Sequence, residues 1–144
     1  MESAGKHKPA GERELLAGIA INGPWRGFVR EAQNPKKRHY GWGYSLRGDL
    51  SDEVIESLKS SDKGRRIKNG TRVYLAYWDP GKDATATIFR MGYVDYIRRD
   101  GHFISFAFHL DEMVDLRVPV GSDQVLLRYV DSSAVQPAEL AQSV

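Results

Sequence analysis

The strongest constraint on the fold is a run of short segments, in the second half of the chain, in which side chains alternate in character every second residue. This period is typical of β-strands, whose side chains point alternately to the two faces of a sheet. Turn signals separate the segments, and Asp100-Gly101 is a dipeptide that favours tight hairpins. We therefore expect consecutive strands joined by hairpins over residues 71–78, 85–97, 102–110 and 124–130.

The first half of the chain adds two expected strands and one helix. Residues 39–46 alternate large side chains with glycine and serine, and residues 25–32 form a less regular strand candidate. Residues 15–22 are a short apolar run that ends in a turn signal. The helix is predicted at about 51–61, with Ser51 as its N-cap and Gly64 just beyond its end.

These segments predict a mainly β protein of the α+β class. At 144 residues the chain fits one domain, which we place at 14–131, with polar tails at 1–13 and 132–144. Regular hairpin spacing indicates a small antiparallel β-barrel or a strongly bent sheet of about six strands, with the helix packed on it. Gly92, inside the segment 85–97, suggests a bulge or sharp bend.

Composition excludes several classes of protein. The chain has no cysteine, so disulfide frameworks, thiolate nucleophiles and cysteine-bound zinc are excluded. No apolar run approaches the roughly 18 residues of a membrane helix, and residues 1–14 lack the apolar core of a signal peptide. We expect a soluble cytoplasmic protein that does not contact a membrane.

Charge is distributed unevenly along the chain. The formal net charge is +2, yet residues 26–72 carry twelve Lys or Arg against six Asp or Glu. Clustered cations of this kind bind phosphates and release condensed counterions. The candidate phosphate-binding residues form two clusters, which are Lys36, Lys37 and Arg38, and then Arg65, Arg66, Lys68 and Arg72.

Motifs of catalysis are absent from the sequence. The chain contains no GxSxG, GxxxxGK[ST] or HExxH pattern, and its four histidines are scattered. We therefore name no catalytic residue, metal or cofactor and expect a binding module, with an enzyme that has a dispersed active site of aspartate and histidine residues left open as an alternative.

Aromatic side chains within the expected strands provide a second candidate feature. Tryptophan and tyrosine stack on nucleic-acid bases or enclose a flipped base, although a small sheet also needs rings in its core. Combined with the basic clusters, these rings predict a module that binds DNA or RNA. The candidate stacking or cage residues are Trp42, Tyr44, Tyr74 and Trp78.

One segment resembles a known family. Residues 67–77, Ile-Lys-Asn-Gly-Thr-Arg-Val-Tyr-Leu-Ala-Tyr, are similar to the turn that leads into a central strand in EVE-type domains of the PUA-like superfamily. The similarity spans about residues 42–108, with Thr71 where the family usually has an acidic residue. This resemblance implies a small barrel that recognises nucleic acid, often through a modified base in an aromatic pocket. Trp42, Tyr44 and Trp78 would form that pocket.

A second resemblance leaves an alternative open. Arg26 and Arg30 match the Arg-x-x-x-Arg element of PilZ domains, and Asp49-Leu50-Ser51 is similar to the start of their second element. That element requires glycine where this chain has Val54. The resemblance implies binding of a cyclic dinucleotide through Arg26 and Arg30. A protein-interaction or assembly domain that meets its partner through exposed aromatic residues is the third alternative.

Overall fold

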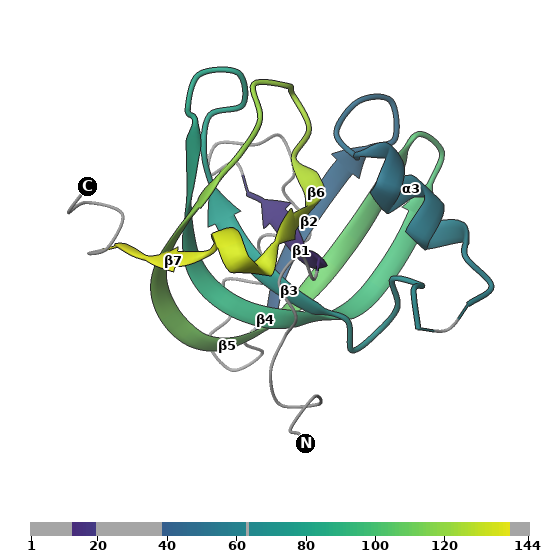
Figure 1. The fold of residues 1–144 in the computed structure, drawn as a ribbon. Coiled ribbons are helices and arrows are strands. Elements are labelled where there is room, and N and C mark those ends of the chain that lie inside the picture. The colour runs from purple at the N-terminus through teal and green to yellow at the C-terminus, as the bar shows by residue number, and fades with distance from the viewer. Residues whose placement is uncertain (1–12, 20–38, 63, 139–144) are drawn as a thin grey trace.

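The computed structural model describes residues 13–19, 39–62 and 64–138. The predicted strand at 25–32 lies outside these residues. Within them, seven strands and one α-helix follow one another along the chain, together with a short 3-10 helix, η1 (Figure 1). In chain order they are β1 (Arg13–Gly18), β2 (His39–Ser45), α3 (Asp52–Lys59), β3 (Arg72–Tyr77), β4 (Thr85–Asp100), β5 (Phe103–Pro119), β6 (Leu127–Asp131), η1 (Ser132–Ala134) and β7 (Gln136–Pro137).

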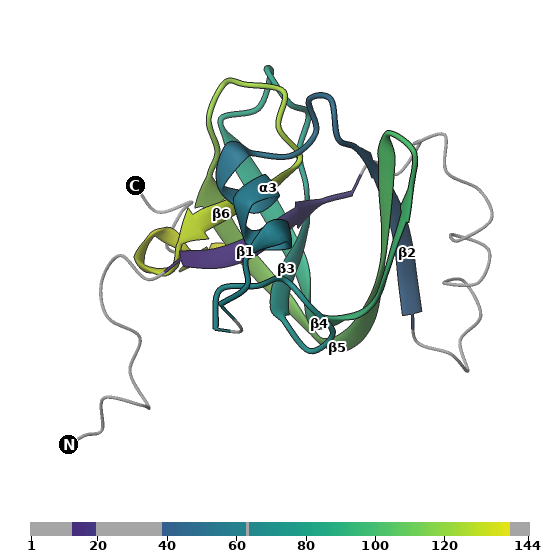
Figure 2. The same ribbon diagram turned by 90° about the vertical axis from the view of Figure 1, so that its right-hand side faces the viewer.

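The strands form one mixed sheet, in the order β2-β5-β4-β3-β1-β6, with β7 paired to β5. The prediction of a mainly β, α+β protein with one packed helix is therefore confirmed. The sheet bends strongly but does not close into a barrel, because its terminal strands β2 and β6 do not pair within the described residues (Figures 1 and 2). The expected all-antiparallel pairing is wrong at one place, where β1 runs parallel to β3.

The bend follows β4 and β5, which are 16 and 17 residues long. Their pairing shifts register three times, and each such bulge bends and twists the sheet locally. One shift lies next to Gly92, as predicted; a Cβ there would lie 2.2 Å from the carbonyl oxygen of His109. The predicted end of the third strand at residue 110 is wrong, since β5 continues to Pro119 and pairs there with the start of β4.

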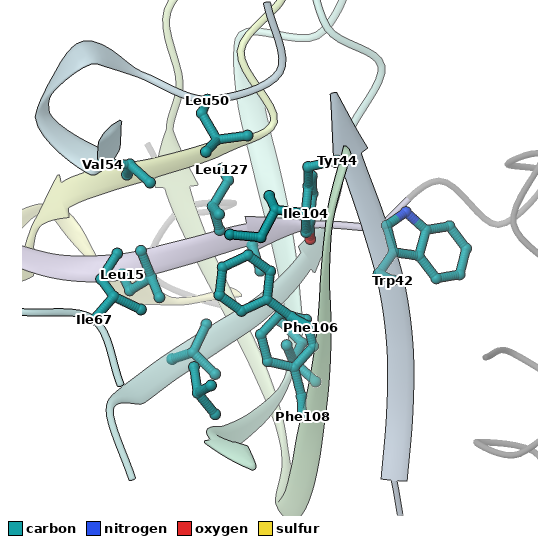
Figure 3. Packing of buried hydrophobic residues seen from close by; sticks show 14 of the residues in the cluster. Leu15, Trp42, Tyr44, Leu50, Val54, Ile67, Ile104, Phe106, Phe108 and Leu127 are labelled. Carbon is teal, nitrogen blue, oxygen red and sulfur yellow. The ribbon is translucent and has the colours of Figure 1, made fainter. Parts of the chain in front are cut away.

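Both faces of the sheet carry a hydrophobic cluster. The larger cluster lies between the sheet and α3, and Figure 3 shows its rings and aliphatic side chains meeting there. The smaller cluster covers the other face, where the segment leading to β7 packs. β3 contributes to both by alternation, because Val73 and Leu75 point into the larger cluster and Ala76 into the smaller one.

The helix begins as predicted and ends early. The Ser51 hydroxyl accepts a hydrogen bond from the Val54 amide at 3.2 Å, and the fully buried Val54 side chain holds α3 on the sheet. The helix ends at Lys59 rather than at residue 61, because Ser60 adopts an extended conformation with ψ of 136°. Gly64 does not take the positive φ of a helix-terminating glycine. The loop takes a positive φ further along, at Gly70, whose φ is 94°.

The described elements reach beyond the predicted C-terminal boundary, whereas the predicted start at residue 14 lies within β1. Residues 15–18 form part of a strand, and β1 pairs with both β3 and β6. At the other end, the expected tail from residue 132 contains η1 and β7, and Ala138 is buried. The fold therefore extends to Ala138 instead of ending at residue 131. None of the helices in the described residues is long and apolar enough to cross a membrane.

Candidate nucleic-acid interface

An open groove of about 1020 Å³ lies where α3, β1, β6 and the loop between α3 and β3 meet. Figure 2 shows α3 beside β1 and β6, with the chain descending from the helix toward β3. Six cationic side chains and three carboxylates line the groove. The cations are Arg13, Lys59, Arg65, Arg66, Lys68 and Arg72, and the carboxylates are Glu14, Glu53 and Glu56.

The loop that follows α3 holds its cations in place through backbone hydrogen bonds. The amides of Arg65 and Arg66 both donate to the carbonyl oxygen of Asp62, at 3.0 Å each. The amide of Ile67 donates to the carbonyl oxygen of Ser57 on the helix, and the Ile67 side chain is buried in the larger cluster. Ile67 is thus the buried anchor of a loop whose neighbouring residues are exposed. Arg65 and Arg66 therefore project into solvent from a fixed backbone.

The end of the loop is fixed in a similar way. The Thr71 hydroxyl accepts a hydrogen bond from the Lys68 amide, and the Thr71 amide donates to the Lys68 carbonyl, both at 3.0 Å. Gly70 takes the positive φ that this tight turn requires. The turn leads directly into Arg72 at the start of β3, so the four predicted cations of this cluster line one groove.

The cations of the groove differ in their existing ion pairs. Arg13 lies 2.9 Å from Glu53, and Arg72 lies 2.7 Å from Asp111. Both pairs are solvent-exposed, so each contributes little to stability and can be exchanged for another anion. Lys59, Arg65 and Arg66 make no ion pair with any part of the chain that the structure describes. These three are therefore the cations most available to a phosphate group.

The predicted cage residues lie elsewhere, and they serve the core. Trp42 and Tyr44 belong to the larger hydrophobic cluster and Trp78 to the smaller one, so the three rings do not surround one pocket. All three are buried, and Tyr74 is partly buried against the smaller cluster. Buried rings in two separate clusters do not form an open cage in this arrangement, and a base-stacking role for these residues stays a prediction.

Tyr44 shows most clearly how such a ring is used. Its side chain is fully buried, and its hydroxyl donates a hydrogen bond to the carbonyl oxygen of Gly18 at 3.0 Å. It meets Phe106 edge to face, with ring centroids 5.9 Å apart. Burial, and then the charge of Asp49, raise the pKa of the Tyr44 hydroxyl well above its usual value. In Figure 3 the Trp42 indole lies at the margin of the cluster, directed away from Phe106.

Sequence reasoning missed two cations of the groove. Arg13 lies at the end of the segment 1–13, which the sequence predicts to be a polar tail. Lys59 is the last residue of α3 and belongs to neither of the predicted basic clusters. Only the β1–β3 pairing and the placement of α3 bring them to the loop. The remaining predicted site residues, Arg26, Arg30, Lys36, Lys37 and Arg38, lie outside the described residues, and their roles stay predictions.

No family model, no curated protein and no solved structure matches this chain. The resemblances to PUA-like and PilZ domains therefore stay predictions. Within the described ranges, no group of three or more histidine or carboxylate side chains is placed to hold a metal ion.

Proposed function

We propose that the protein is a non-catalytic nucleic-acid-binding module whose basic groove contacts the phosphate backbone. The observation that carries the proposal is the convergence of six cationic side chains on one groove, four of them predicted from sequence. These four residues, Arg65, Arg66, Lys68 and Arg72, are exposed and come from one continuous stretch of chain.

The chemistry of these side chains favours phosphate as the ligand. Arginine presents a planar fork of donors that binds two phosphate oxygens at once, and four of the six cations are arginines. The backbone under Arg65 and Arg66 is fixed by hydrogen bonds, which lowers the entropy lost when their guanidiniums bind. The three carboxylates of the groove reduce its net charge and so weaken its attraction for any anion, phosphate included.

The lining of the groove favours contact with the backbone over recognition of a base. Tyr129 is the single aromatic side chain that the described residues contribute to it. Phosphate contacts fix position and supply affinity, whereas contacts with base edges supply sequence specificity. The proposal is therefore a groove that binds DNA or RNA with little dependence on sequence.

Binding of labelled single-stranded and duplex DNA and RNA, followed by fluorescence anisotropy, tests the proposal. The variant is Arg65→Ala/Arg66→Ala, which lowers the net charge from +2 to 0. Lys82→Glu is the matched control, because it gives the same net charge at an exposed turn away from the groove. Loss of binding in the double variant alone supports the groove. Equal losses in both variants, or no binding by the parent protein, would contradict it.

A further inference from the structure

A second surface on the molecule combines exposed aromatic rings with unpaired cations. It lies at the tip of the β4–β5 hairpin, where Tyr96 is 46% and Phe103 55% exposed, and both are among the most exposed large hydrophobic side chains of the described residues. We call it the tip surface and define it as Arg47, Tyr96, Arg98 and Phe103. Figure 2 shows the hairpin standing on the opposite side of the bent sheet from α3, so the tip surface is separate from the groove.

The register of the hairpin places the two rings on one face. Tyr96 pairs with Ala107, and Arg98 pairs with Ser105. Paired residues of antiparallel strands point to the same side, and Phe103, Ser105 and Ala107 alternate onto that side along β5. Tyr96, Arg98 and Phe103 therefore share the face that is opposite to the core residue Phe106.

The tip is held in place by the turn between β2 and α3. The Leu46 amide donates to the carbonyl oxygen of His102 at 2.7 Å, and Gly101 takes a φ of 60° in the hairpin turn. Arg47 comes from this neighbouring turn, and its guanidinium donates to Nε2 of His102 at 2.9 Å. Arginine carries only donors, so the ring nitrogen is the acceptor in this contact.

The cations of the tip surface are available to an anionic ligand. Arg98 and Arg99 make no ion pair with the described residues, and Asp100 is the carboxylate that lies beside them in the turn. The guanidiniums of Arg47 and Arg98 thus flank two exposed rings, whereas Arg99 pairs with Ile104 and lies on the opposite face of the hairpin. A positively charged surface with exposed rings matches single-stranded nucleic acid, whose phosphates bind the cations while unstacked bases stack on the rings. A duplex keeps the faces of its bases stacked inside the helix, so it does not offer them to these rings.

We infer that the tip surface binds single-stranded nucleic acid, with bases stacked on Phe103 and Tyr96 and phosphates bound by Arg47 and Arg98. The inference takes its class of ligand from the proposed function, but it depends on a different surface. It predicts that the protein prefers single strands over duplexes, a preference that the groove alone does not provide.

The experiment compares Phe103→Ala with Met113→Ala. Both residues are exposed on β5, and Met113, which is 74% exposed, lies far along the strand from the tip. The probes are a labelled oligothymidine of about 12 nucleotides, within the site sizes of single-strand binding folds, and a duplex of equal length. Loss of a stacking contact weakens binding by roughly 5- to 150-fold. We expect that loss for the oligothymidine with Phe103→Ala, and no change for the duplex or for Met113→Ala.

Further variants separate the possible outcomes. Phe103→Trp retains a ring and is expected to retain binding, whereas Phe103→Leu retains only apolar volume and is expected to lose it. If Arg65→Ala/Arg66→Ala weakens binding and Phe103→Ala does not, the groove proposal stands and the tip inference is overturned. If Phe103→Ala weakens binding and Arg65→Ala/Arg66→Ala does not, the groove proposal is overturned and the tip inference stands. Two further results overturn the tip inference. The first is that the parent protein binds no oligonucleotide. The second is that Phe103→Ala loses binding to anionic lipid vesicles but keeps its binding to oligonucleotides.

Discussion

Removing the two unpaired arginines of the groove is expected to change the salt dependence of nucleic-acid binding by a calculable amount. For duplex DNA, each neutralised phosphate contributes about 0.9 to the slope of log K against log salt concentration. Lys59, Arg65 and Arg66 make no ion pair with the described residues, and these three cations counted alone give a parent slope of about −2.7 by the same rule. The Arg65→Ala/Arg66→Ala variant retains one of the three, and its expected slope is about −0.9.

These slopes predict a large difference over an ordinary range of salt. Between about 50 and 200 mM salt, the parent protein is expected to lose roughly 40-fold in affinity and the variant only three- to four-fold. Affinity is measured by fluorescence anisotropy with one duplex at several salt concentrations. The fold itself is expected to be unchanged within about 0.5 kcal/mol, because both side chains are exposed and the hydrogen bonds at this turn use their backbone amides.

Two results would refute this reasoning. Parallel salt curves for the parent protein and the variant would mean that neither guanidinium contacts a phosphate. An equal flattening of the curve in Lys82→Glu would mean that net charge, and not the groove, controls binding. A thermal unfolding curve for each variant shows whether a loss of affinity reflects a loss of folded protein.

Substitutions at three positions test the fold. Gly92→Ala is expected to destabilise the protein by about 3 kcal/mol or more in urea unfolding, because its Cβ would overlap a backbone carbonyl of β5; an unchanged midpoint would contradict the close approach. Ser51→Ala is expected to cost about 1 kcal/mol by removing the helix cap, and Ser51→Asp to restore it. Tyr44→Phe leaves a buried carbonyl without its donor and is expected to cost about 1–3 kcal/mol. Because the folded-state pKa of Tyr44 is raised, the unfolded chain ionises first, and the parent protein is expected to lose stability as pH rises above about 10. Tyr44→Phe is expected to lose less stability over the same range, and parallel curves of stability against pH for the two proteins would contradict this.

Local patterns predicted the parts of this fold that depend on local physics. The alternation in β3 assigned its two faces, the Ser51 cap marked the start of α3, and Gly92 marked a bulge. Each of these follows from residues adjacent in sequence. The cations of the loop were predictable for the same reason, since a short run of exposed arginines lies on one surface wherever the loop is placed.

The parts that were missed depend on contacts distant in sequence. The run at residues 15–22 contains no signal that it pairs with β3, so the parallel strand and the groove wall that carries Arg13 were not predicted. The aromatic residues were ambiguous for another reason. A large ring alternating along a strand has the same pattern whether it fills a core, as Tyr44 does, or meets a ligand, as we infer for Phe103.

The position of β1 between β3 and β6 also determines when during folding the groove can exist. β1 lies between β3 and β6, and the hydrogen bond from Arg13 to the Tyr129 carbonyl joins residues 116 positions apart. The β3–β4–β5 hairpins require only neighbouring segments, and contacts between neighbours form before contacts that close long loops. During synthesis the hairpins, and the tip surface with them, are therefore expected to form while β6 is still missing. The groove is complete only when β6, which carries its lining residue Tyr129, has emerged, so a nascent chain would acquire its two surfaces at different times.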